Sequence, residues 1–182
     1  MPTIFTHAIV PLAIGAGLGR QRISRPLLLA GGVAAMLPDL DVISFRLHIA
    51  YASDFGHRGV SHSLFFALML GMLAASLAPR LKTRPLLAFC WVSFSAASHG
   101  LLDMLTNGGL GVAWWWPLTD QRYFFPCRVI QVSPLKLQRF LDPDAMGVIT
   151  SELLWVWLPA PLLAAALRLV TGRRDAEQQS RA

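Results

Sequence analysis

PLLAFCWVSFSAASHGLLDMLT, residues 85–106, is the segment from which the architecture follows. As a helix at about 1.5 Å per residue it would extend about 33 Å, enough to cross the roughly 30 Å hydrocarbon core of a bilayer. Its first residue, Pro85, suits the first turn of a helix, where the missing N–H would have no partner. It carries two ionisable residues, His99 and Asp103. The segment therefore predicts a membrane-spanning helix with a polar pair near its C-terminal end.

Four other apolar segments extend this prediction to the whole chain. Several are short: residues 4–19 reach only about 24 Å as a helix, so such helices would thin the bilayer or lie beside a water-filled recess. Pro159 and Pro161 predict a kink in the last segment. We expect an all-α, polytopic membrane bundle of about five short helices with a long irregular outer loop. The segments are residues 4–19, 26–45, 63–78, 85–106 and 149–170.

The composition favours lipid as the surrounding solvent. Hydrophobic residues make up 54% of the chain and charged residues 14%, against roughly 45–50% and about 25% in soluble domains. The net charge of +6 does not indicate nucleic-acid binding. Its Lys and Arg residues fall in short clusters between apolar segments, as in cytoplasmic loops of membrane proteins.

The basic clusters predict the orientation. They lie in residues 20–25, 80–84 and 168–181, and all three fall on one side if the five segments alternate. That side is expected to be cytoplasmic. Residues 39–61 and 107–148 then face outward, and the latter stretch holds Trp and Tyr residues like those of an interfacial aromatic belt.

The chain is expected to form one membrane domain at residues 1–172, followed by a polar, frayed tail at 173–182. Its two cysteines lie in different settings, Cys90 in an apolar segment and Cys127 in the outer loop. We therefore expect no disulfide between them.

Ionisable residues inside apolar segments are costly in lipid, so each one indicates a function or a buried partner. Counted from the cytoplasmic ends of their helices, His7, Asp39 and His99 all lie about 18–21 Å deep. Asp103 is one turn further out, and His62 lies near the outer surface. Residues from four segments are thus predicted to converge on one layer in the outer half of the membrane.

Two pairs stand out within that layer. His99 and Asp103 are spaced i, i+4 and leave one helix face, so they suit a shared metal, an Asp-oriented His, or a buried hydrogen-bonded pair. Asp39 and Asp41, in Pro38-Asp39-Leu40-Asp41, suit metal bridging because a cation relieves their repulsion. The alternative for the second pair is ordinary helix-end and turn chemistry.

The segment His57-Arg58-Gly59-Val60-Ser61-His62-Ser63 opens the third predicted helix. Imidazole is a good zinc ligand, a guanidinium holds phosphate oxygens in a fork, and a helix N-terminus favours an anion. His57 and Arg58 are therefore catalytic candidates, with a solvated loop as the alternative for both. His48 belongs to no cluster.

Together these segments offer the nitrogen and oxygen ligands typical of zinc or a similar divalent ion. Such an ion would acidify a bound water and polarise a phosphoryl or carbonyl oxygen. The metal-ligand candidates are His7, Asp39, Asp41, His62, His99 and Asp103.

These motifs resemble the YdjM-like family, inner-membrane-associated, LexA-regulated proteins described as metal-dependent hydrolases. The resemblance covers about residues 1–125 and implies a multi-pass protein of the bacterial inner membrane. The outward side that the basic clusters indicate for the site would then be the periplasmic face. The matching stretches are Thr6-His7, Leu37-Pro38-Asp39-Leu40-Asp41, the 57–63 segment, Ser98-His99-Gly100-Leu101-Leu102-Asp103-Met104-Leu105-Thr106 and Trp116-Pro117-Leu118.

The family is also distantly similar to zinc-dependent phospholipases C and to single-strand nucleases with three-zinc sites. Those enzymes use further histidines and an acidic residue after the His-x-x-x-Asp pair. Here no histidine follows His99, and Asp120 is the nearby acidic candidate. The resemblance therefore implies one or two ions. Its ligands would be His7, Asp39 or Asp41, His62, His99 and Asp103.

Three functions fit the sequence. The first is a metal-dependent hydrolase, a phosphoesterase whose metal-activated water attacks a lipid or lipid-linked substrate, with Arg58 steadying the anionic group. The second is a non-catalytic membrane protein whose buried His/Asp network sets helix packing or binds a partner. The third is a small transporter or channel, which the lack of an internal repeat disfavours. Membrane lipid is an expected partner and nucleic acid is not, while the sequence leaves the oligomeric state open.

Overall fold

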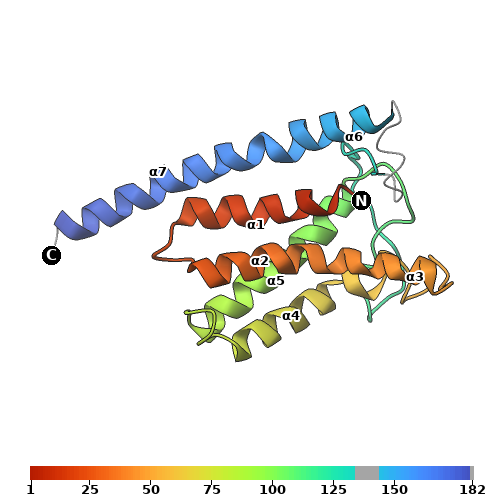
Figure 1. The fold of residues 1–182 in the computed structure, drawn as a ribbon, viewed down its shortest axis with the longest axis horizontal. Coiled ribbons are helices and arrows are strands. Elements are labelled where there is room, and N and C mark those ends of the chain that lie inside the picture. The colour runs from red at the N-terminus through yellow and green to blue at the C-terminus, as the bar shows by residue number, and fades with distance from the viewer. Residues whose placement is uncertain (134–143, 181–182) are drawn as a thin grey trace.

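The computed structural model describes residues 1–133 and 144–180 and confirms the predicted all-α membrane bundle. Five helical segments alternate in direction along the chain (Figure 1). The described residues contain two isolated β-bridges and no β-strand. The segments are α1 (Ile4–Leu18); α2 (Arg25–Met36), continued by the 3-10 helix η1 (Leu37–Val42) and by α3 (Ile43–Arg46); α4 (Leu64–Ser76), preceded by the 3-10 helix η2 (Val60–His62); α5 (Pro85–Met104); and α6 (Asp144–Glu152), the π-helical turn η4 (Leu153–Trp157) and α7 (Pro159–Ser180).

Local sequence signals set the helix starts. The side chain of Ser24 caps α2 by accepting a hydrogen bond from the backbone N–H of Leu27, and Ser63 caps α4 through Phe66 in the same way. Such caps satisfy backbone donors that have no partner within the helix. Pro85 occupies the first turn of α5, as the sequence predicts.

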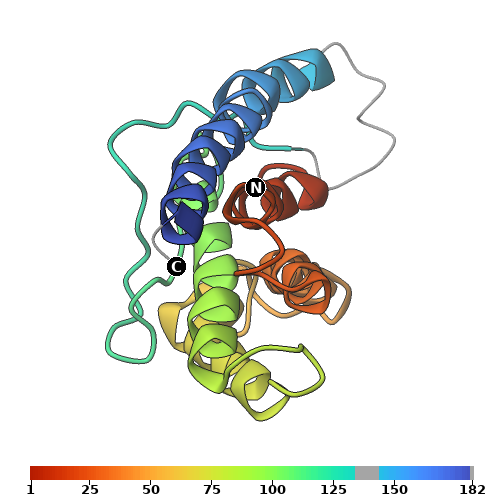
Figure 2. The same cartoon turned by 90° about the vertical axis from the view of Figure 1, so that its left-hand side faces the viewer.

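The helices pack through small residues. Helix α5 contacts both α4 and α2, while α1 contacts α2 and α7; Figure 2, which looks along the bundle, shows this arrangement. At the α2–α5 contact Gly31 lies against Trp91 and Ser95, and Gly71 of α4 lies against Ser93. In lipid no hydrophobic driving force acts between helices. Small residues let the backbones approach closely, and the resulting van der Waals packing favours helix association.

The outside of the bundle is apolar. Leu29, Leu73 and Leu162 are more than half exposed, whereas the polar residues described below are buried. Three helices are long and apolar enough to cross a membrane, at Arg25–Arg46, Pro85–Met104 and Met146–Gly172. The two shorter ones, α1 and α4, agree with the prediction of short spans.

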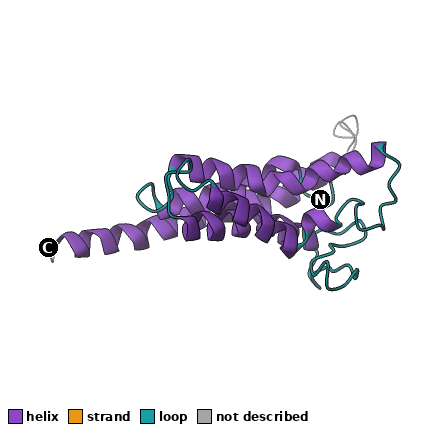
Figure 3. Cartoon of the chain, turned by 90° about the horizontal axis from the view of Figure 1, so that it is seen from below, coloured by secondary structure: helices purple, strands orange, loops and turns teal. Residues whose placement is uncertain are grey.

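The connections divide between the two ends of the bundle. The α1–α2 and α4–α5 connections lie together at one end, and the longer segments 47–59 and 105–133 lie at the other (Figures 1 and 3). The basic clusters at residues 20–25 and 80–84 therefore share an end, as alternation of the helices requires.

The fifth helix differs from the prediction in three ways. It begins at Asp144, so the irregular loop is shorter than 107–148; residues 134–143 lie outside the described part. Where Pro159 and Pro161 predict a kink, the helix has a π-helical turn just before Pro159. In this turn the backbone N–H of Leu158 donates a hydrogen bond to the carbonyl oxygen of Leu153. Such a turn absorbs a local interruption of the helical hydrogen bonds.

The expected frayed tail is the third difference, because the backbone stays helical through Ser180. Its Ala, Arg, Glu and Gln residues are strong helix formers, and extending an existing helix avoids the cost of nucleation. Cys90 and Cys127 are both free, as expected.

Candidate metal centre

The structure gathers five predicted ligands at one end of the bundle. They come from four segments: His7 from the first turns of α1, Asp39 from η1, His62 from η2, and His99 and Asp103 from α5. All five are buried, with 0–2% of each residue exposed. The convergence predicted from helix depths is thus confirmed.

Four of these residues offer ligand atoms that all lie within 4.8 Å of one another. The Nε2 atoms of His62 and His99 are 2.9 Å apart. His99 Nε2 lies 3.3 Å from an Asp39 oxygen, and His62 Nε2 lies 3.4 Å from an Asp103 oxygen. Two imidazoles and two carboxylates therefore point at one small volume, which is a common donor set for zinc.

His7 lies on the edge of this group. Its Nε2 atom is 3.7 Å from an oxygen of Asp39 and 3.7 Å from an oxygen of Asp103. Its ring stacks on that of His99, with centroids 3.6 Å apart and an interplanar angle of 17°. At this position His7 could be a further ligand of an ion held by the other four residues.

The hydrogen bonds fix which histidine nitrogens face the centre. His99 Nδ1 lies 2.7 Å from the carbonyl oxygen of Ala35, so that nitrogen carries the proton and donates it. His62 Nδ1 lies 3.1 Å from a carboxylate oxygen of Asp41. Each ring then directs the lone pair of Nε2 inward. Metal-binding histidines are commonly held by such outer hydrogen bonds.

Asp41 belongs to a second, outer group with His57 and His62. One of its oxygens lies 2.5 Å from His57 Nδ1, and the other accepts hydrogen bonds from the Ser61 hydroxyl at 2.5 Å and from the Arg58 backbone N–H at 3.0 Å. This carboxylate thus ties the 57–62 segment to η1. It faces the outer side of His62, whereas Asp39 faces the inner side.

Arg58 is completely buried, so its predicted alternative as part of a solvated loop is wrong. Its Nε atom lies 2.9 Å from an Asp103 oxygen, Nη1 donates to the Gly108 carbonyl at 2.8 Å, and Nη2 donates to the Thr106 hydroxyl at 2.9 Å. The solvated-loop alternative is also wrong for His57, of which 3% is exposed. Arg58 adopts a left-handed backbone with φ of 63°, which costs about 1–2 kcal/mol in an L-residue.

The hydrogen bonding and the charge of the buried His and Asp residues both fit a bound cation. Among the residues that the structure describes, both oxygens of Asp39 and of Asp103 and both nitrogens of His7 are buried without a hydrogen-bond partner that meets normal geometry. Buried polar atoms almost always have partners. The carboxylates of Asp39, Asp41 and Asp103 and the Arg58 guanidinium leave two negative charges when the histidines are neutral. Burial lowers the pKa of the neighbouring N-terminal amine to about 6, so this amine adds little positive charge at pH 7. One divalent ion would supply both the missing contacts and the missing charge.

The same surroundings affect the His62 imidazole. Burial lowers its pKa, but hydrogen bonds to Asp103, Asp39 and Asp41 outweigh this and raise the pKa well above the usual 6.5. The carboxylates around this ring therefore favour a positive charge at its position.

Comparisons with known proteins identify the family of this membrane protein. The sequence matches the model of the family described as YdjM inner membrane protein over residues 1–174. The chain belongs to the YdjM family. It is also 49% identical over 169 residues to Inner membrane protein YbcI of Escherichia coli (strain K12), an alignment that covers 92% of this chain and 97% of that protein. No solved structure gives a significant match.

The YdjM-family resemblance stated from the motifs is thus confirmed, and the chain is a membrane protein with a buried His/Asp group that could hold a metal ion. Asp120, the acidic candidate suggested by the three-zinc enzymes, is exposed and belongs to neither ligand group among the described residues. His48 is exposed, consistent with the prediction that it belongs to no cluster.

Sequence reasoning missed a polar contact beside the centre. Glu152, at the end of α6, is buried and accepts hydrogen bonds from the Thr3 backbone N–H and hydroxyl, at 2.6 and 2.7 Å, and from the Thr6 hydroxyl at 2.5 Å. Trp157 donates to the same Thr6 hydroxyl. The signal was present, because Glu152 is an ionisable residue within an apolar segment.

The outer loop of this YdjM-family chain packs against the 51–58 segment. Arg122 donates to the backbone carbonyls of His57, Tyr51 and Ser53 at 2.9–3.1 Å. The Ala113 N–H donates to the carbonyl of Arg58. Burial lowers the pKa of the Arg122 guanidinium. The loop thereby holds in place the backbone that carries the outer ligand group.

Proposed function

We propose that the protein is a membrane-bound hydrolase that depends on a divalent cation, zinc, and acts on a phosphoester of a lipid or lipid-linked substrate. The observation that carries this proposal is the group of Asp39, His62, His99 and Asp103, whose ligand atoms lie within 4.8 Å of one another. These four residues would hold one ion, with His7 as a further ligand and the outer group as a place for a second ion. The ion would supply an acidified water and a polarised phosphoryl oxygen.

Toward the inner ion, Asp41 and Arg58 act in this proposal as positioning residues. Asp41 fixes the ring of His62 through Nδ1, and Arg58 holds the Asp103 carboxylate. The sequence-based role of Arg58, steadying an anionic substrate, remains a prediction. The three side-chain contacts of Arg58 described above are all to protein groups, which favours the positioning role. His57, predicted from the sequence to be a catalytic candidate, would be suited to proton transfer because it lies on the outer side of the site.

A hollow beside the outer group offers an approach for an apolar substrate. It has a volume of about 340 Å³ and reaches Asp41 and Ser61. Its remaining lining is largely apolar and includes Leu47, Phe55 and Phe66. A lipid-like chain would fit such a wall, with a polar head toward Asp41.

The basic clusters favour a periplasmic location for this site. Residues 20–25 and 80–84 lie at the opposite end of the bundle from the metal centre (Figure 1). Clusters of Lys and Arg are enriched in cytoplasmic loops. With that end in the cytoplasm, the substrate would be a lipid or lipid-linked phosphate of the outer leaflet of the inner membrane.

The complete burial of the inner ligands favours a second candidate, a structural ion that locks the helices without catalysis. One experiment separates the two. The full chain, purified in detergent and loaded with zinc, is assayed for bound metal, thermal stability and hydrolysis of phosphomonoesters and phospholipids. The variants are His99→Ala and Asp39→Asn, with the exposed His48→Ala as a matched control.

The hydrolase predicts that both site variants lose zinc and hydrolysis together, while His48→Ala keeps both. A structural ion predicts that zinc raises stability in the wild type and not in His99→Ala, with no hydrolysis by either. Wild-type protein that binds no zinc would refute both.

A further inference from the structure

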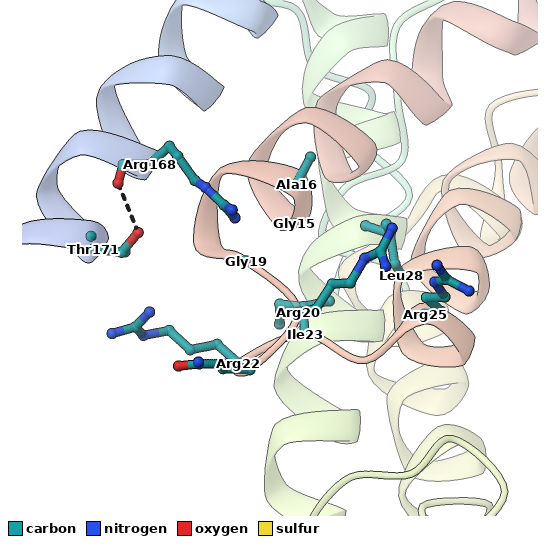
Figure 4. A pocket seen from close by; sticks show the side chains of 12 residues that line it. Gly15, Ala16, Gly19, Arg20, Arg22, Ile23, Arg25, Leu28, Arg168 and Thr171 are labelled. Atoms are coloured by element: carbon teal, nitrogen blue, oxygen red, sulfur yellow. Dashed lines mark hydrogen bonds between the residues drawn. The ribbon is translucent and has the colours of Figure 1, made fainter. Parts of the chain in front are cut away.

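A second cavity lies at the end of the bundle away from the metal centre. Its volume is about 740 Å³, and it opens between the α1–α2 connection and the C-terminal half of α7. Figure 4 shows it from close by, with Arg168 extending from α7 toward α1. Four arginines line it, and they are Arg20, Arg22, Arg25 and Arg168.

The ionisable side chains among the described residues that line this cavity are all positively charged. None of the described residues that line it is acidic. Arg20, Arg25 and Arg168 are exposed, and their side chains form no ion pair with a carboxylate among the described residues. Exposed arginines that line one cavity and form no such pair, here Arg20, Arg25 and Arg168, are available to bind phosphate oxygens.

The rest of the lining combines aliphatic, small and neutral polar residues. Leu28 and Ile23 contribute aliphatic surface, Gln21 and Thr171 contribute neutral polar groups, and Gly19 lies where α1 ends. Gly19 has φ of 82°, and a Cβ there would lie 3.0 Å from Nη1 of Arg168. Glycine therefore both permits this turn and leaves room for the arginine.

We propose that this cavity binds the phosphate headgroup of an anionic phospholipid such as phosphatidylglycerol. The arginines would hold the phosphodiester, and the acyl chains would follow the exposed apolar residues that flank the cavity, Leu29 on α2 and Leu169 on α7. Basic pockets between membrane helices are suited to anionic headgroups. A free phosphate ion would gain the same charge contacts but would leave the aliphatic wall without a partner.

The test is native mass spectrometry of the delipidated full chain titrated with phosphatidylglycerol or phosphatidylcholine. The double variant Arg20→Gln/Arg168→Gln removes two cavity charges. The matched control Arg80→Gln/Arg84→Gln removes two exposed charges from the α4–α5 connection, outside the cavity. Ala16→Trp fills the cavity without a change of charge.

The wild type is expected to prefer phosphatidylglycerol. The cavity double variant should bind it about thirtyfold more weakly, whereas the control should lose less than about threefold, as for charges screened by solvent. Ala16→Trp should also weaken binding, which tests the site even if the double variant unfolds.

Three results would overturn the proposal. Equal losses in the two double variants would show that general surface charge holds the lipid. An unchanged affinity in Ala16→Trp would place the lipid elsewhere. Displacement of the lipid by inorganic phosphate at comparable affinity would identify the ligand as the free ion.

Discussion

Replacing Asp41 with Asn tests whether this carboxylate positions His62 or binds the ion itself. The two Asp41 oxygens receive four contacts, from His57 Nδ1, His62 Nδ1, the Ser61 hydroxyl and the Arg58 backbone N–H. Asparagine keeps the shape but offers one oxygen and one NH₂ group. In either orientation the carboxylate charge is lost and the NH₂ group faces the Nδ1 atom of His57 or of His62, so that imidazole keeps a partner only by changing its tautomer.

The loss of an outer hydrogen bond to a metal-binding histidine typically weakens metal affinity about 10–100-fold, equivalent to about 1.4–2.8 kcal/mol. We expect that loss for Asp41→Asn, with the protein still folded. Asp39→Asn should lose more, because its oxygen lies 3.3 Å from His99 Nε2 within the inner ligand group. Zinc affinity is measured by competition with a fluorescent chelator, beside thermal unfolding of each variant.

The matched control is Asp54→Asn, which makes the same change at an exposed carboxylate of the 47–59 segment and should leave zinc affinity unchanged. If Asp41→Asn weakens zinc binding as much as Asp39→Asn does, the positioning role is wrong and Asp41 is a ligand. If neither change affects zinc binding, the inner group is not the metal centre.

Three further predictions follow from the contacts around the centre. Because the folded-state pKa of His62 is raised, its protonated ring stabilises the metal-free protein below the unfolded pKa, and that stability is lost as the pH rises through the folded pKa. The thermal midpoint of the metal-free protein should therefore fall with rising pH while zinc affinity increases; opposite trends would contradict this. Glu152→Gln should lower stability by about 1–3 kcal/mol, since one acceptor oxygen for the α1 threonines is replaced by a donor, and calorimetry should show zinc affinity unchanged. Thr106→Val should cost a similar amount, because the buried Arg58 guanidinium loses an acceptor; a neutral effect in chemical unfolding would show that water replaces the hydroxyl.

The helix pattern and the depth of the ionisable residues were predictable from the sequence. Apolar segments fix the axial position of each helix, and 1.5 Å per residue converts sequence distance into depth. Depth alone put His7, Asp39 and His99 in one layer. The i, i+4 spacing then put Asp103 on the same face of α5 as His99.

The choice between Asp39 and Asp41 could not be made in this way. Both lie in η1, a 3-10 helix with three residues per turn, so side chains two positions apart leave it in different directions. Which carboxylate faces inward depends on how η1 docks against α5 and η2, a tertiary property. The burial of Arg58 was equally hidden, because its acceptors Thr106 and Gly108 lie far along the chain.

The distribution of ligands over four segments has a consequence for biogenesis. A chain emerging from the ribosome exposes His7, Asp39 and His62 before Asp103 is synthesised, so the coordination sphere of the proposed ion would close only after the fourth span enters the bilayer. Until then the carboxylate of Asp39 would have no cation to neutralise it in a low-dielectric medium. Metal capture would thereby be coupled to insertion of the fourth span, and a nascent chain arrested before residue 99 should emerge unable to retain zinc.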